Sequence, residues 1–362
     1  MGATQDLSIA SHRALSVPSR PGRVTQNVRR RLEQYAANPR CEANVVAAMR
    51  GVAMRDVARA LGLDAPFGQS PFALQRGQMF ERTLFEEDAA PLRRALIERK
   101  VLPANAAGFL DLRIRQGGGS LDMLDEAAAR FERFLREAAR ATGDARMQLP
   151  TIVAGATLRA PDGVLGGGLV ALDVLTVHPQ PRPAPITLRV GEVKVYPDRG
   201  GFTDPAELAT ARAQAGTYVY VLERAVETLG LARDLLVADD GFLVLSRPGS
   251  NQPSVRAGED LQHQSARARE VFSRMKDLPD LAEQQGVGAV LQAPKQYGDA
   301  CLSFCELADR CRDEALAQGL PVALGEDLAR LLGPLSLHRA LELLHGAAPH
   351  GDAETDFLRR AR

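Results

Sequence analysis

The sequence contains no tryptophan, few aromatic residues and only four cysteines among its 362 residues. It has no apolar run that approaches the ~18 residues of a membrane span, so we expect no membrane partner. The opening residues, MGATQDLSIASHRALSV, lack the apolar core of a secretory signal peptide, and we therefore expect a cytoplasmic protein. Thiols stay reduced in that compartment, so the four cysteines are not expected to form structural disulfides.

The chain also lacks an excess of charge of either sign, because 45 Lys and Arg residues balance 45 Asp and Glu residues. A net charge of zero gives no support to a nucleic-acid partner, although local patches decide such binding. One such patch is Arg29, Arg30 and Arg31, within a stretch from Leu7 to Cys41 that has seven arginines and a single acid. Two interpretations stay open: a solvated N-terminal arm, and a surface that contacts DNA phosphates.

There is enough apolar material for a core, since 45% of the residues are hydrophobic and 25% are charged. Branched apolar runs alternate with helical periodicity, which predicts an α/β fold with a mixed central sheet flanked by helices. A helical segment precedes this core, and a Leu-rich helical cap follows it. The predicted strands are 151–157, two within 166–197, 235–238 and 242–246, and the predicted helices are 28–37, 42–50, 54–63, 120–141, 204–230 and, in a helical region after residue 253, 266–275.

Three charged residues lie where apolar side chains are expected. In the strand ITLRVGEVKVYP, side chains alternate between two faces, so Glu192 and Lys194 share the face of its first apolar residues. Asp173 interrupts the preceding apolar run, where a lone carboxylate is costly to bury unless a cation or hydrogen bonds compensate it. We expect that removing Glu192 or Lys194, as an unpaired buried charge, leaves the fold intact. The competing interpretation is a surface Glu–Lys pair on an edge strand.

The helix that follows these strands carries Gln214 and Tyr218, four residues apart and so on one helical face. The ordered set of Asp173, then Glu192 and Lys194 as E-x-K, then Q-x-x-x-Y resembles the PD-(D/E)XK nuclease superfamily, RecB-like branch. The resemblance covers residues 70 to about 313 and implies a restriction-endonuclease-like core. It also implies that Gln214 and Tyr218 contact substrate phosphate or brace the lysine.

The resemblance implies hydrolysis of phosphodiester bonds assisted by Mg²⁺ or Mn²⁺. Such hard cations prefer oxygen ligands, so Asp173, Glu192 and the carbonyl of Val193 are the expected metal ligands. Lys194 is expected to orient or help deprotonate the attacking water and to offset phosphate charge. Because the RecB-like branch includes exonucleases, the resemblance implies exonuclease cleavage as one possibility. Endonuclease cleavage stays open.

Gly77, Phe80 and Glu81 resemble the motif on the first helix of the RecB-like core, where many members place a metal-binding His. This chain has Phe80 and Glu81 there, so Glu81 is a candidate metal ligand by resemblance. An exposed helical glutamate is the alternative.

All four cysteines fall into one arrangement, with Cys41 upstream of the core and Cys301, Cys305 and Cys311 in a C-x3-C-x5-C cluster after it. The spacing resembles the iron–sulfur clasp of part of the RecB-like family, which implies a structural 4Fe–4S cluster. Four thiolates also suit tetrahedral Zn²⁺. Unligated core thiols are the third interpretation.

The resulting division is residues 1–68 as an N-terminal arm and helical segment with Cys41, 69–313 as the nuclease core with the cysteine cluster, and 314–362 as the cap. We expect a metal-dependent DNA nuclease that acts on single strands or duplex ends, in DNA repair, recombination or defence against foreign DNA. The sequence has no Walker motif, so any helicase activity must come from a partner protein. The alternatives are a non-catalytic DNA-binding or scaffold subunit that retains the nuclease fold, and an enzyme that acts on RNA.

Overall fold

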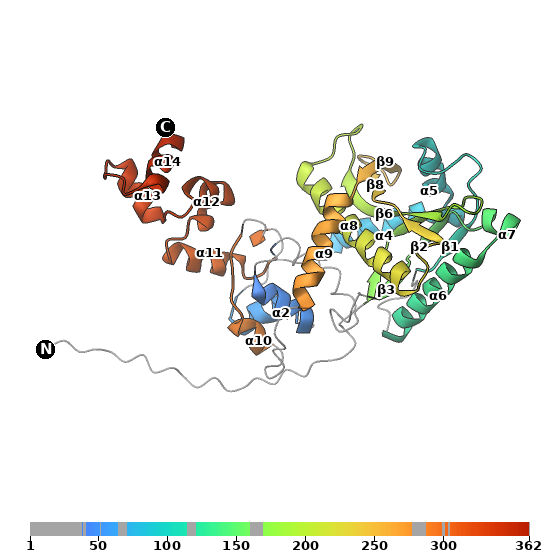
Figure 1. Ribbon diagram of the computed structural model, residues 1–362, viewed down its shortest axis with the longest axis horizontal. Coiled ribbons are helices and arrows are strands. Elements are labelled where there is room, and N and C mark those ends of the chain that lie inside the picture. Colours follow the sequence, from blue (N-terminus) through green and yellow to red (C-terminus); the bar gives the residue numbers. More distant parts are fainter. Residues whose placement is uncertain are drawn as a thin grey trace.

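The computed structural model describes residues 38, 41–50, 52–63, 71–113, 121–159, 169–276, 287–298, 301–302 and 305–361. The predicted helix 28–37, with Arg29, Arg30 and Arg31, lies outside the described residues. The described chain is an α/β structure with a mixed central sheet flanked by helices, which confirms this part of the fold prediction (Figure 1).

A seven-stranded mixed sheet forms the centre of the structure. Its strands are β1 (Phe109–Asp111), β2 (Ile152–Ala154), β5 (Val174–His178), β6 (Ile186–Pro197), β7 (Leu235–Val237), β8 (Asp240–Ser246) and β9 (Pro253–Asp260). Their order is β1-β2-β5-β6-β8-β9, with β7 also paired to β6. Neighbours β2, β5 and β6 are antiparallel, whereas β6 pairs in parallel with β7 and β8. Two short strands, β3 (Thr157–Arg159) and β4 (Leu169–Ala171), form a separate antiparallel pair.

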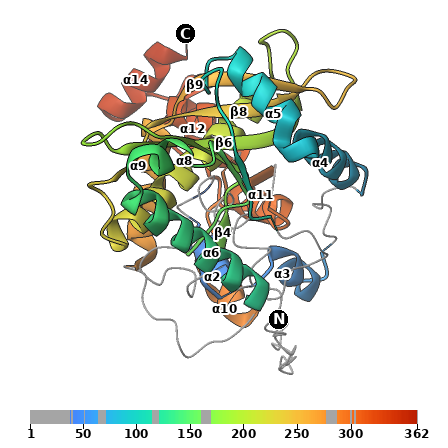
Figure 2. The same ribbon diagram turned by 90° about the vertical axis from the view of Figure 1, so that its right-hand side faces the viewer.

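Helices cover both faces of the sheet (Figure 2). One face packs against α4 (Pro71–Leu84) and α5 (Glu86–Glu98), and the other against α6 (Leu121–Arg140), α8 (Pro205–Thr228) and α9 (Gln262–Lys276). A short helix, α7 (Gly143–Met147), lies between α6 and β2. The α8 crossover is needed because β6 and β8 run parallel, and a hairpin cannot join parallel strands.

Most predicted elements are confirmed at or near their expected bounds. The start of α8 is capped, because the Asp204 carboxylate accepts a hydrogen bond from the Glu207 backbone N at 3.2 Å. The prediction that the chain turns helical directly after Pro253 is wrong, because β9 comes first and α9 begins only at Gln262. The sequence of β9, PSVRAGED, has weak strand propensity, so it is the ladder with β8 that makes it a strand.

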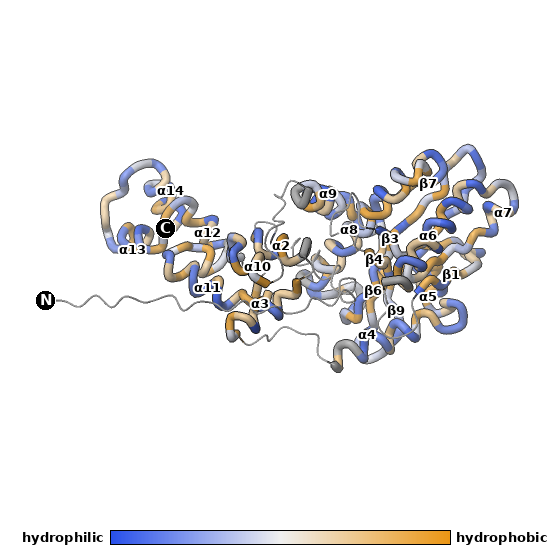
Figure 3. The backbone as a smooth tube through the Cα atoms, turned by 90° about the horizontal axis from the view of Figure 1, so that it is seen from below, coloured by the Kyte–Doolittle hydropathy of each residue, from blue (hydrophilic) through white to orange (hydrophobic). Residues whose placement is uncertain are grey.

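A second hydrophobic core lies next to the sheet core, in which Val45 is buried. It is built by α2 (Glu42–Arg50), α3 (Met54–Ala60), α10 (Val287–Gln292) and α11 (Ala308–Ala317), and we call it the cysteine core because all four cysteines belong to it or pack against it. Figure 1 places α2 and α10 side by side between the sheet and the C-terminal helices, and Figure 3 shows hydrophobic chain in this region as well as in the sheet. Segments that precede and follow the sheet in the sequence therefore meet in one core.

The C-terminal helices form a third, small core. They are α12 (Glu326–Leu332), α13 (Leu337–Leu344) and α14 (Asp352–Arg360). The 3-10 helix η4 (Pro321–Leu324) precedes them and buries Ala323 in the cysteine core. Buried Leu332, Leu343 and Phe357 pack together here. Arg339 joins α13 to α14 by two parallel hydrogen bonds to the Glu354 carboxylate, at 2.9 and 2.8 Å. In the described ranges, no helix combines the length and the apolar character needed to cross a membrane.

Gly191 leaves room for the ring of Phe242 on the α4–α5 face of the sheet. A Cβ at this position would lie 2.2 Å from two ring atoms of Phe242, its ladder partner on β8. The Phe242 ring can therefore lie across β6 only where the strand has no side chain, directly before the charged residue Glu192.

We predict that Gly191→Ala lowers the free energy of unfolding by about 1–3 kcal/mol, because the buried ring must move. Urea unfolding of the full chain measures this. Gly77→Ala is the matched control, since a Cβ there meets nothing within 4 Å on helix α4, and it should stabilise by up to about 1 kcal/mol. Equal stability of Gly191→Ala and the parent protein would contradict this packing.

Candidate functional site

Asp173 and Glu192 meet where β5 and β6 lie side by side. The antiparallel ladder pairs Val174 with Gly191, so the preceding residue of β5 and the following residue of β6 are cross-strand neighbours. The Asp173 Oδ2 atom accepts a hydrogen bond from the backbone N of Val193 at 3.0 Å. This bond ties the carboxylate to the edge of β6 just beyond the end of the β5 ladder.

Glu192 and Lys194 form an ion pair on one face of β6. The Lys194 Nζ atom lies 3.1 Å from Glu192 Oε1, and the two side chains are 19% and 0% exposed. The alternate residues Val193 and Val195 face the opposite layer, where α4 and α5 pack. The expectation that these are unpaired charges is therefore wrong, because each is the other's partner. A fully buried carboxylate is tolerable only with such compensation, so removing one partner should be costly.

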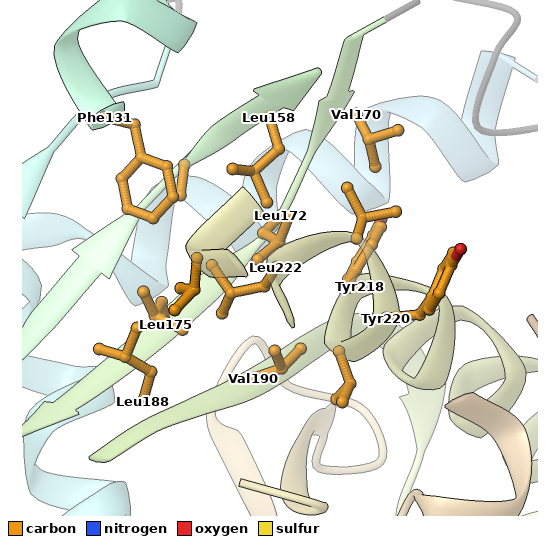
Figure 4. Packing of buried hydrophobic residues seen from close by; sticks show 14 of the residues in the cluster. Phe131, Leu158, Val170, Leu172, Leu175, Leu188, Val190, Tyr218, Tyr220 and Leu222 are labelled. Atoms are coloured by element: carbon orange, nitrogen blue, oxygen red, sulfur yellow. The ribbon is translucent and has the colours of Figure 1, made fainter. Parts of the chain in front are cut away.

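Gln214 and Tyr218 lie together in the layer between α8 and the sheet. The Gln214 Nε2 atom donates to the Tyr218 hydroxyl at 3.5 Å, and both side chains are buried. Figure 4 shows the Tyr218 ring in the same apolar cluster as Val190, two residues before Glu192. Ala211, three residues before Gln214, packs with Leu243, the ladder partner of Glu192.

These contacts place the Gln214 carboxamide at the level of Glu192. Its Oε1 atom has no hydrogen-bond partner among the described residues, although it is buried. Gln214 and Tyr218 are both buried. They are therefore better placed to brace the Glu192–Lys194 pair than to contact a substrate.

Glu81 occupies a different setting. It is exposed on α4, next to the buried Phe80, which packs on the α4–α5 face of the sheet. The side chain of Glu192 faces the opposite layer, so the sheet itself does not direct Glu81 toward the other two carboxylates. Across the described ranges, no three His, Cys, Asp or Glu side chains are arranged to hold a metal ion.

The four cysteines gather in the cysteine core. Cys41 lies directly before α2, and the neighbouring backbone of Ala43 donates a hydrogen bond to the Pro294 carbonyl at 3.1 Å. The Cys305 backbone N donates to the Cys301 carbonyl at 2.8 Å, which brings the two residues together. Cys311 lies on α11. All four are free thiols.

Burial is the main influence on the pKa values of three of these thiols. It raises the pKa of Cys301 and of Cys305, and it raises the pKa of Cys311 to about 11. Each of these pKa values is also raised by the Cys41 thiol, so all four sulfur atoms lie within electrostatic reach of one another. A bound cation would reverse this preference, because metal ligation deprotonates thiols.

The sequence analysis missed two asparagines that flank Cys41. The Asn38 Nδ2 atom donates to the Cys301 Sγ atom at 3.2 Å, across 263 positions of sequence. Asn44 is 4% exposed, and neither its Nδ2 nor its Oδ1 atom has a partner in the described part of the chain. Both residues lie within three positions of Cys41, which is the only signal that the sequence offers.

Comparison of the chain with protein-family models, with curated proteins and with solved structures finds no match. The functional assignment therefore depends on the residues and contacts described above.

We predict that Lys194→Met lowers the free energy of unfolding by about 2–4 kcal/mol at pH 8, because it leaves the buried Glu192 carboxylate without its cation. The double variant Glu192→Gln/Lys194→Met should recover much of this loss. Urea unfolding of the single and double variants gives the coupling energy.

The control is Arg59→Met, which breaks an exposed ion pair with Asp56, at 3.2 Å with side chains 65% and 53% exposed. It should cost no more than about 0.5 kcal/mol. A Lys194→Met variant that loses no more stability than Arg59→Met would show that the buried pair contributes nothing.

Proposed function

We propose that this protein is a divalent-metal-dependent deoxyribonuclease of the PD-(D/E)XK type with a structural 4Fe–4S cluster. The observation that carries the proposal is the meeting of Asp173 with the buried Glu192–Lys194 pair at the β5–β6 junction. Asp173 comes directly before β5 and Glu192 lies on β6, yet the two residues lie at the same end of the β5–β6 ladder. Buried charges without a structural need are typical of functional sites.

Asp173 and Glu192 offer the carboxylate oxygens that a hard cation prefers. The N–H and C=O groups of one strand residue point to the same side of the strand. Because the Val193 N–H points to Asp173, its carbonyl also faces that side and can serve as a third ligand. A bound Mg²⁺ or Mn²⁺ would supply an activated water and charge neutralisation at the scissile phosphate.

Lys194 is the residue of the pair that reaches the surface, with 19% of its side chain exposed. Its ammonium group balances the negative charge of Glu192 in the structure. When a bound cation balances that charge instead, Lys194 can turn toward a phosphate or an attacking water. Gln214 and Tyr218 hold α8 against the strand beneath this pair.

The proposed substrate is DNA, as single strands or duplex ends. Arg29, Arg30 and Arg31 are the proposed phosphate contacts, and Glu81 is a proposed additional metal ligand. A helicase or another protein partner would supply strand separation. We further propose a cytoplasmic location and a role in DNA repair, recombination or defence, with exonuclease and endonuclease modes to be separated by experiment.

The cysteine core supports the proposed cluster. Its thiols are free, and they come from segments that precede and follow the sheet in the sequence but share this core. Cys41, Cys301, Cys305 and Cys311 would be the ligands, and binding would release their protons. Zn²⁺ on the same thiolates is the alternative, and elemental analysis separates the two metals.

A second candidate function is a non-catalytic DNA-binding or scaffold subunit. The complete burial of Glu192, together with that of Gln214 and Tyr218, favours it, because the ion pair could then be purely structural. Metal-dependent cleavage of DNA separates the two functions.

We predict that the purified chain degrades 5′- or 3′-labelled DNA with Mg²⁺ or Mn²⁺ and not with EDTA. Asp173→Ala and Lys194→Arg should lower the rate at least 100-fold, because general acid–base and metal-assisted steps of this kind contribute that much or more. Both variants should still bind DNA.

Asp204→Ala is the control, since it removes a carboxylate that caps α8. Matched RNA substrates test the preference for DNA. Full activity of Asp173→Ala and Lys194→Arg would refute the proposed active site, whereas no cleavage by the parent protein on any labelled substrate would favour the scaffold.

We predict that anaerobically purified protein is brown, contains iron and sulfide, and loses both together with thermal stability in Cys41→Ser. Cys41 and Cys301 are 260 positions apart, and loop closure costs only about 0.6 kcal/mol per doubling of length. A ligand that holds the two ends together therefore transfers much of its binding energy to folding.

The matched control is Ala58→Ser, a polar substitution at a fully buried position of the same core. It should leave iron and sulfide unchanged. A colourless Cys41→Ser variant with an unchanged melting temperature would contradict the clasp, and zinc in place of iron would contradict the cluster.

A further inference from the structure

Asn38 is held in place by two hydrogen bonds from one side-chain atom. Its Nδ2 donates to the Gln296 carbonyl at 2.7 Å and to Cys301 Sγ at 3.2 Å. A carbonyl oxygen can only accept, so the atom that contacts Gln296 must be the nitrogen. The second N–H is thereby directed at the cysteine sulfur, and the Asn38 side chain is almost fully buried.

Asn44 is a second buried polar residue near the four cysteines. It is buried on α2, and its backbone N donates a hydrogen bond to the carbonyl of Cys41, directly before the helix, at 3.0 Å. Ala43, Val46 and Ala47 belong to the cysteine core, whereas the adjacent Val45 belongs to the sheet core. Neither amide atom has a hydrogen-bond partner among the described residues. A buried amide without a partner is unfavourable, so this position calls for a polar group that the protein chain does not itself supply.

We propose that Asn38 and Asn44 donate N–H hydrogen bonds to the sulfur atoms of the cluster and set its reduction potential. This inference rests on the proposed function, because it requires a 4Fe–4S cluster on the four cysteines. Thiolates and cluster sulfides carry negative charge and accept hydrogen bonds. The reduced cluster carries one more negative charge than the oxidised cluster, so donors of this kind stabilise it more and raise its potential.

The two asparagines act through the cysteine sulfurs and are not expected to touch substrate. They come from the N-terminal side of the clasp, whereas three of the four thiols come from the C-terminal side. Docking of α2 against the 287–311 region would thus deliver one cysteine ligand and two hydrogen-bond donors together.

The test uses the full chain with its cluster reconstituted anaerobically. The variants are Asn38→Leu and Asn44→Leu, which keep side-chain volume and remove the donor, together with the double variant. Iron and sulfide are quantified first, and the reduction potential is then measured by spectroelectrochemical titration. Asn105→Leu, the same substitution at an exposed position, is the control.

We expect full iron and sulfide in each single variant and a reduction equilibrium shifted about tenfold toward the oxidised cluster, or ~59 mV for a one-electron couple. The double variant should shift further. Asn38→Asp and Asn44→Asp, which keep the shape and add negative charge, should shift the potential in the same direction even if a leucine variant folds poorly.

Potentials equal to the parent's in iron-loaded leucine and aspartate variants would overturn the inference while leaving the cluster intact. Parent protein that binds zinc or no metal would overturn the proposed cluster, and this inference with it. The two failures are distinguished by the iron content of the parent protein.

Discussion

The burial of the Glu192 carboxylate beside Lys194 is the interaction on which the candidate site depends. Glu192 has no exposure to solvent, and an ionised carboxylate cannot stay there without a cation. The pair lies on the α8 face of β6, where α8 packs with the buried side chains of Gln214 and Tyr218. β5 places Asp173 beside Glu192 at the end of the β5–β6 ladder.

Gly191 and Asn38 show how contacts between distant segments position individual side chains. Gly191 leaves room for the Phe242 ring to lie across β6 immediately before Glu192. Asn38 joins the start of the described chain to Cys301. Both contacts join segments that are distant in sequence, and both position residues that carry chemistry on rigid elements.

Sequence patterns predicted most of the fold because the main signals are local. The helices predicted at 120–141 and 204–230 depend on short-range sequence features, and both form close to these bounds. β9 was missed because its strand character comes from pairing with β8 rather than from its own residues. Period-two alternation predicted that Glu192 and Lys194 share a face. It could not predict that they pair, because alternation says nothing about rotamers, and the burial of Asn44 is a tertiary property with no sequence signal.

The central claim is that Asp173 and Glu192 hold a divalent cation beside Lys194. The most direct measurement is anomalous diffraction from crystals of the full chain soaked in Mn²⁺, with Asp173→Ala crystals treated in the same way. The account predicts an anomalous peak between the two carboxylates and the Val193 carbonyl in the parent protein, and none there in the variant. Manganese that binds only elsewhere on the molecule, or an Asp173→Ala peak unchanged from the parent, would contradict it.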